Sequence, residues 1–122
     1  MPQADQGEVS ANARRLLADE DSQDVILFNL MQVIQGCVDL AAHVVSDEGY
    51  GMAGSMQEFF ELLSQQQLIS EDLAGAMKSA VGFRNLIAHE YAKIDLAQVY
   101  VVATDGIRDL EEFLAMMVRR FA

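Results

Sequence analysis

One short segment of this sequence sets polar groups capable of chemistry into an apolar background. Within residues 82–91 the chain supplies a permanent cation at Arg84, an amide at Asn85, an imidazole at His89 and a phenol at Tyr91. Imidazole exchanges protons near neutral pH, and a guanidinium group binds phosphate through two hydrogen bonds at once. Taken alone, Arg84 also fits a surface cation, and His89 a helix C-terminal residue beside exposed carbonyl groups. The segment therefore indicates either a phosphate-handling site or an ordinary helix end.

The spacing of these residues is awkward for a site built from one chain. On a helix, Arg84 and Tyr91 share one face, and Asn85 and His89 share another. Arg84 and His89 are separated by roughly 140° around the helix axis. Pairing of this helix with its symmetry mate across a two-fold axis would let both residues from both chains line one cleft.

The N-terminal part of the chain is expected to be a separate extension. Residues 1 to about 9 are polar, and Ser10 is a plausible cap for a short helix in the stretch 11–20. An acidic break follows this stretch. We therefore divide the chain into an extension with a short helix, residues 1–21, and a helical domain, residues 22–122.

The longest apolar segment, residues 25–45, predicts a helix capped by Ser22 or Asp24. Apolar residues occupy nearly every face of this helix. Its polar residues fall three or four apart and form one narrow stripe: Asn29, Gln32, Gln35, Asp39, His43 and Ser46. A helix of this kind is buried on more than one side, which indicates contact with a second subunit as well as with its own core.

Three further helices are predicted from caps and apolar periodicity. They are expected at residues 56–66 after Ser55, at residues 71–89 after Ser70, and from residue 96 after Asp95. The inward residues are expected to be Phe59, Phe60, Leu62 and Leu63 in the first of these helices, and Leu96, Val99, Val102, Ile107, Leu110, Phe113, Leu114, Met117 and Phe121 in the last. The predicted fold is all-α, an antiparallel bundle of four main helices with a short N-terminal helix.

The residues around the polar segment resemble a known family. Arg-Asn-x-x-x-His-x-Tyr at residues 84–91, near the end of the penultimate helix, is similar to the signature of HEPN-domain proteins, particularly the HepT-like toxins. The resemblance extends to residues 38–44, to Gly82 and Phe83, and to Val99 and Tyr100. It covers roughly residues 24–121, and residues 1–21 are the divergent part.

This resemblance implies a function and a set of site residues. HepT-like proteins are all-helical homodimers that act as metal-independent endoribonucleases, usually encoded beside a minimal nucleotidyltransferase antitoxin. Carried over, Arg84 and His89 are catalytic at the dimer interface, and Tyr91 is the residue that the antitoxin modifies with AMP. Asn85 would orient His89 or bind substrate. RNA is the implied substrate, no metal or other cofactor is implied, and an assembly larger than the dimer stays open.

The charge of the chain favours a rival function. The net charge is −11, and residues 25–77 hold seven acidic side chains and no Lys or Arg. Such a balance opposes non-specific binding of polyanions, because phosphate neutralisation needs clustered basic residues. The rival is a non-catalytic partner or substrate-binding subunit of a minimal nucleotidyltransferase. Neither DNA nor a membrane is expected as a partner.

The remaining signals concern location and the long helix. The lone Cys37 is expected to be a small buried hydrophobe, which fits a reducing cytoplasm. The apolar runs are interrupted before membrane-spanning length and no export signal is recognised, so a soluble cytoplasmic protein is expected. Asp39 and His43 are expected to form an i,i+4 pair, with a role near the active cleft as the alternative.

Overall fold

A computed structural model describes residues 20–121, and all regular elements among them are helical. The helices are α2 (Glu20–Glu48), α3 (Met56–Gln65), α4 (Glu71–His89), α5 (Leu96–Val101) and α6 (Ile107–Phe121). A 3-10 turn (Tyr91–Lys93) precedes α5, and a π turn (Val102–Gly106) joins α5 to α6. The all-α bundle of four main helices is confirmed. The short helix expected after Ser10 lies outside the described residues.

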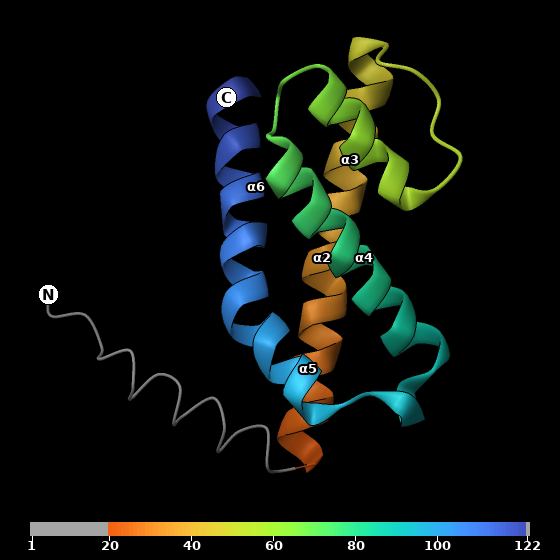
Figure 1. The fold of residues 1–122 in the computed structure, drawn as a ribbon, viewed down its shortest axis with the longest axis vertical. Helices are drawn as coiled ribbons and strands as arrows, with labels where there is room; N and C mark the ends of the chain where they lie inside the picture. Colours follow the sequence, from red (N-terminus) through yellow and green to blue (C-terminus); the bar gives the residue numbers. More distant parts are fainter. Residues whose placement is uncertain (1–19, 122) are drawn as a thin grey trace, which may run out of the picture.

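The helices are arranged so that one end of the bundle gathers the segment of interest. In Figure 1, α2 runs through the molecule with α4 and α6 against it, and α3 packs on α2 and α4. Helix α4 runs opposite to both α2 and α6. The N-terminal end of α2, the C-terminal end of α4 and α5 therefore lie at the same end of the bundle (Figure 1).

Three of the four caps predicted for the main helices are confirmed. The side chains of Ser55, Ser70 and Asp95 accept hydrogen bonds from backbone N–H groups two or three residues later, at 3.3, 3.0 and 3.0 Å. Each bond satisfies a donor that the first helical turn leaves without a partner. The starts of α3, α4 and α5 are thus fixed by local chemistry.

The predicted start of the long helix is wrong. The chain is already helical at residue 20, where the described part begins, so neither Ser22 nor Asp24 caps the helix, which runs to Glu48. The division proposed between residues 21 and 22 falls within this helix, and it stays a proposal because residues 1–19 are outside the described part.

The end of α2 follows from its glycine. Gly49 has a φ of +68°, a left-handed conformation that glycine adopts without steric cost. The N–H of Tyr50 donates to the carbonyl of Val45 at 3.0 Å, and that of Gly49 to Ser46 at 3.3 Å. This pair of bonds is a Schellman motif, which satisfies the last carbonyl groups of the helix.

The core lies between all four main helices. The largest fully buried side chains are Phe60, Phe113, Ile34, Leu63, Met77, Val45, Val81, Val99 and Cys37. The rings of Phe60 in α3 and Phe113 in α6 meet edge to face, with their centroids 5.3 Å apart. Lys78 and Glu61 form an ion pair between α4 and α3. Cys37 is a buried hydrophobe as predicted, and burial raises the pKa of its thiol to about 11.

Residues 96–121 are helical throughout, as predicted, but a π turn interrupts the helical register. The Thr104 hydroxyl donates to the Tyr100 carbonyl at 2.8 Å inside the π turn, a bond that bends helices. The wider turn shifts the side chains after it, so one helical period cannot hold across it. Leu114 and Phe121, expected to face inward, are therefore 37% and 44% exposed. Leu96, also expected to face inward, is 50% exposed at the start of α5, before the π turn.

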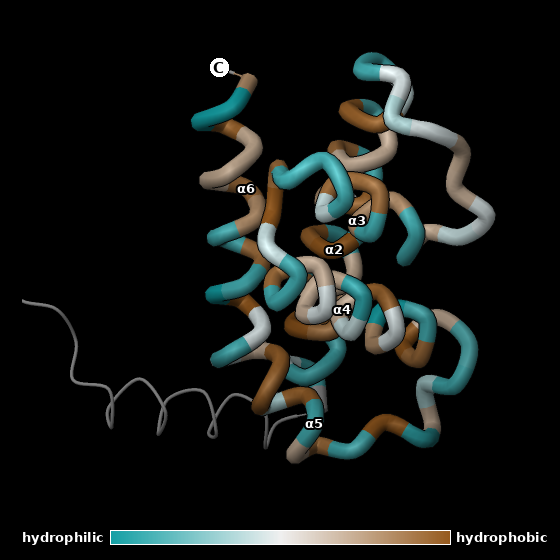
Figure 2. The backbone as a smooth tube through the Cα atoms, turned by 45° about the horizontal axis from the view of Figure 1, so that its top comes forward, coloured by the Kyte–Doolittle hydropathy of each residue, from teal (hydrophilic) through white to brown (hydrophobic). Residues whose placement is uncertain are grey.

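The expectation that no apolar run reaches membrane-spanning length is wrong for α2. Residues 21–48 are long and apolar enough to cross a membrane by length and composition alone. The buried side of α2, which includes Ile34, Cys37 and Ala41, lies in the bundle core, and the predicted polar stripe lies on its outer side. α2 thus has the character of the core helix of a bundle. Figure 2 shows hydrophobic and hydrophilic segments alternating along α6, which covers one flank of it.

Candidate active site

The C-terminal end of α4 positions three of the four predicted site residues. Arg84 and Asn85 are half-buried in the last turns of the helix, and His89 is its exposed final residue. The Arg84 Nη1 donates to Asn85 Oδ1 at 3.2 Å. In this chain Asn85 therefore contacts Arg84. It holds the end of the guanidinium group that a phosphate would meet.

One hydrogen-bond donor of the Arg84 side chain has no partner in the described structure. Its Nε is buried, and no hydrogen-bond acceptor reaches it among the described residues. A buried donor left unsatisfied costs about 1–3 kcal/mol, so the missing partner of this Nε calls for an explanation. The guanidinium is thus held at Nη1 by Asn85, while its buried Nε is a donor that the described fold leaves unused.

His89 and Arg84 are not brought together within one chain. α4 stays a regular α-helix through His89, so the separation of roughly 140° around the axis is kept. Arg84 is half-buried against the bundle, whereas His89 is exposed. No hydrogen bond or ion pair of the His89 side chain is present within the part of the chain that the structure describes. Its imidazole is available to a substrate or to a second subunit.

Tyr91 does not share a helix face with Arg84, which corrects the prediction from spacing. α4 ends at His89, Glu90 leaves the helical conformation at φ −138° and ψ 45°, and Tyr91 begins the 3-10 turn. The Tyr91 hydroxyl donates a hydrogen bond to the Asp24 carboxylate of α2. The ring is 50% exposed.

Asp24 is a neighbour of the candidate site that sequence reasoning missed. The sequence suggested it only as a helix cap, and a contact across 67 residues leaves no trace in local spacing. Two shallow hollows border the Tyr91 ring. One is lined by Asp24, Leu27, Phe28, Met31, Ile87, Ala88 and Tyr91, and the other by Gln23, Leu27, Tyr91, Ala92, Ile94, Leu96 and Val99. Among the described residues, Asp24 is the one ionisable neighbour of Tyr91 in either lining.

The predicted pair of Asp39 and His43 is wrong. The amide of Gln35 donates to Asp39 at 2.9 Å, and His43 pairs with Asp47 at 3.0 Å. Each residue thus keeps the i,i+4 spacing but takes a different partner, since several polar side chains share the outer stripe of α2. Asp39 and His43 make no contact with Arg84, Asn85, His89 or Tyr91 in these interactions.

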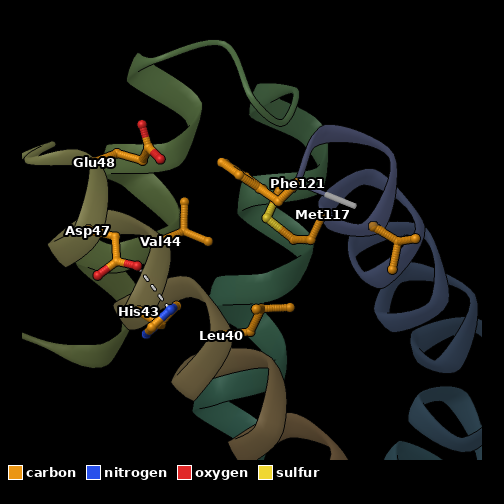
Figure 3. Close-up of a pocket in the computed structure, with 8 residues that line it drawn as sticks. Leu40, His43, Val44, Asp47, Glu48, Met117 and Phe121 are labelled. Atoms are coloured by element: carbon orange, nitrogen blue, oxygen red, sulfur yellow. Dashed lines mark ion pairs between the residues drawn. The ribbon is translucent and has the colours of Figure 1, made fainter.

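A third hollow, of about 360 Å³, lies between α2 and the C-terminal part of α6. Figure 3 shows His43 and Asp47 at its edge with Leu40, Val44, Met117 and Phe121 around it. It lies about 29 Å along α2 from Asp24, given the helical rise per residue. Its lining is mainly apolar, and it contains none of the motif residues.

Titratable groups elsewhere do not form a metal centre in the described part of the chain. Across residues 20–121, no group of three or more His, Cys, Asp or Glu side chains is placed to hold a metal ion. The chemistry that the site residues themselves can perform is proton transfer by imidazole and phosphate binding by guanidinium.

Comparison with known proteins agrees with this picture. The family described as "Ribonuclease HepT-like" matches residues 6–117. The mRNA nuclease HepT of Shewanella oneidensis is 30% identical over 107 residues, which are 88% of this chain and 80% of that protein. The tRNA nuclease HepT of Aphanizomenon flos-aquae is 32% identical over 87 residues, covering 70% of this chain and 59% of that protein.

Solved structures show the same fold. A toxin-antitoxin crystal structure with AMP-PNP superposes with a TM-score of 0.79 at 26% identity, covering 89% of this chain and 93% of that one. A tri-AMPylated Shewanella oneidensis HEPN toxin in complex with MNT antitoxin gives a TM-score of 0.79 at 27% identity, covering 90% and 93%. With the Arg84 to Tyr91 motif in place at the end of α4, this chain belongs to the HepT-like ribonuclease family.

Proposed function

We propose that this chain is a metal-independent endoribonuclease toxin of a toxin–antitoxin pair, with Arg84 and His89 as its catalytic residues. The observation that carries the proposal is the half-buried Arg84 guanidinium at the end of α4, which Asn85 holds at Nη1. A permanent cation held in one orientation is suited to bind the phosphate of RNA. His89 supplies an exposed imidazole at the end of the same helix.

The proposed reaction uses the 2′-hydroxyl of RNA as the nucleophile. A base takes its proton, the 2′-oxygen attacks the neighbouring phosphorus, and an acid protonates the departing 5′-oxygen. His89 carries the proton transfers, and Arg84 stabilises the charge that develops on the phosphate. The products carry a 2′,3′-cyclic phosphate and a free 5′-hydroxyl.

The active form in this proposal is a homodimer with a shared cleft. Arg84 and His89 lie on different faces of α4, so one chain presents them poorly to a single phosphate. Val25 and Phe28 on α2, near the same end of the bundle, are 59% and 58% exposed. Burial of such side chains would favour association of two copies. A two-fold axis here would place Arg84 and His89 of both copies around one cleft.

The activity is silenced, in the same proposal, by a minimal nucleotidyltransferase that attaches AMP to Tyr91 in the cytoplasm. A structural neighbour is a tri-AMPylated HEPN toxin in complex with MNT antitoxin. Tyr91 is exposed enough to be reached, and it directly follows the helix that holds Arg84 and His89. The added phosphate would compete with RNA for the arginine, and the nucleoside would obstruct the cleft.

RNA cleavage by the purified chain in excess EDTA tests the proposal. We expect the wild-type protein to cut RNA and to leave 2′,3′-cyclic phosphate ends, and Arg84→Ala and His89→Ala to abolish cutting. Intact RNA in every lane, across several RNA substrates, would instead favour a non-catalytic partner subunit of a nucleotidyltransferase.

Mixing the two inactive variants tests the shared cleft. A heterodimer of Arg84→Ala and His89→Ala holds one intact arginine and one intact histidine, each on a different chain. Cleavage restored by mixing supports a cleft formed by both chains. A mixture that exchanges subunits, as shown by tagged copies, yet stays inactive would show either that both residues must come from one chain or that the cleft needs both copies of each residue.

A further inference from the structure

The hydrogen bond from Tyr91 to Asp24 joins the proposed modification site to a helix far away in sequence. Tyr91 lies in the 3-10 turn after α4, and Asp24 lies near the start of α2. The other charged groups of the turn, Glu90 and Lys93, pair with each other at 3.4 Å. Among residues 20–121, Asp24 is the only ionisable neighbour of Tyr91 in the two hollows that border its ring.

A tyrosine hydroxyl needs help to act as a nucleophile at neutral pH. Its pKa is ordinarily about 10, so nearly all of it is protonated in the cell. A carboxylate that already accepts the hydroxyl hydrogen bond can orient the oxygen and take the proton as a new bond forms. Asp24 meets both requirements, since its carboxylate accepts the bond and is exposed alongside Tyr91.

We propose that Asp24 orients the Tyr91 hydroxyl and accepts its proton during transfer of AMP to Tyr91. This inference rests on the proposed function, in which a nucleotidyltransferase partner presents a nucleoside triphosphate to Tyr91. The Tyr91 oxygen attacks the α-phosphorus, the new O–P bond forms, and the bond from that phosphorus to the bridging oxygen of the β-phosphate breaks. Pyrophosphate leaves with the electron pair, and the hydroxyl proton passes to Asp24.

The same contact distinguishes the unmodified from the modified state. After transfer, the Tyr91 oxygen has no proton to donate, and a phosphodiester anion lies beside the Asp24 carboxylate. Both changes oppose the contact, because the hydrogen bond is lost and two negative charges repel. The modified side chain therefore leaves α2, so that its AMP group is free to turn toward the cations of the cleft. Asp24 thus promotes AMP transfer to Tyr91, and after the transfer it disfavours the original contact between Tyr91 and α2.

The test measures AMP incorporation with the cognate nucleotidyltransferase and ATP, followed by intact-protein mass spectrometry. Asp24→Asn keeps an acceptor oxygen but cannot take a proton. We expect it to lower the initial rate about 100-fold at neutral pH, the usual effect of removing a general base. Asp24→Glu should restore much of the rate. Asp21→Asn removes an exposed carboxylate one turn earlier on α2 and serves as the matched control for charge, with the wild-type rate expected.

The pH profile separates a proton acceptor from a merely structural residue. If the Asp24 carboxylate accepts the proton, the wild-type rate should be nearly flat between about pH 6 and 8. In Asp24→Asn the rate should rise about tenfold per pH unit, because hydroxide must then remove the proton. A wild-type rate and a flat profile in a folded Asp24→Asn protein would overturn the role of Asp24.

Whether AMP is attached to Tyr91 distinguishes a failure of the proposed function from a failure of this inference alone. No AMP on the wild-type chain, or undiminished AMP on Tyr91→Phe, would overturn the proposed modification site and this inference with it. AMP incorporation that requires Tyr91 but not Asp24 would leave the proposed function intact and overturn only the proposed role of Asp24.

Discussion

The guanidinium of Arg84 donates from Nη1 to the side-chain oxygen of Asn85 at 3.2 Å, although the two residues are adjacent in the chain. Adjacent residues on a helix point about 100° apart, so both long side chains must bend toward each other to meet. The amide thereby orients the planar fork of the guanidinium, and the buried Nε stays without a partner in the described structure. In the proposed function, we therefore expect Asn85 to affect catalysis through Arg84.

Substitution of Arg84 tests whether the fork or only the charge matters. Arg84→Lys keeps the positive charge but loses the paired donors, so we expect RNA cleavage to fall by about 100-fold or more. Arg108→Lys on the exposed surface of α6 is the control and should cleave as the wild type does. Full activity in Arg84→Lys would show that a point charge is sufficient.

The two histidines of this chain provide their own control. His89→Ala should lower the RNA cleavage rate by about 100-fold to 10,000-fold, the range for loss of a general acid or base. His43→Ala removes an exposed imidazole that pairs with Asp47, and it should leave cleavage unchanged. Equal loss of cleavage in both variants would instead indicate that His43 has a role near the active cleft.

The core of the bundle should depend on the aromatic contact between α3 and α6. Phe113→Ala removes a fully buried ring that meets Phe60, and we expect it to lower the free energy of unfolding by about 3–5 kcal/mol. Phe121→Ala deletes the same ring at a position 44% exposed on the same helix, so its effect should be much smaller. Urea unfolding followed by circular dichroism measures both. Similar losses in the two variants would mean that Phe121 is covered in solution.

The buried thiol of Cys37 should make stability depend on alkaline pH. Burial raises its pKa from 9.0 to about 11, so between these values the unfolded chain loses this proton while the folded chain keeps it. This contribution to stability is present below pH 9.0 and is lost as the pH rises through about 11. Unfolding free energies of the wild type and Cys37→Ala should converge over this interval. A constant difference between the two proteins would argue against the raised pKa.

Local signals in the sequence were sufficient for most helix boundaries. Ser55, Ser70 and Asp95 cap their helices through bonds to residues two or three positions away, so the pattern contains all that the structure needs. The burial of Cys37 likewise follows from its place on the apolar side of α2. The position of Arg84, Asn85 and His89 near the end of α4 also follows from spacing, because they belong to one regular helix.

Contacts between helices were decided only by the tertiary structure. The register of α6 depends on how the π turn before it is accommodated, which a single helical period does not describe. The pairing of Tyr91 with Asp24 exists because α2 and α4 run in opposite directions and bring residues 67 positions apart to one end of the bundle. Helix capping and periodicity act over one or two turns, whereas packing sets which turns of different helices meet. The sequence by itself therefore determined the helices and the motif they contain, and the packing of α2 against α4 decided which side chain holds Tyr91.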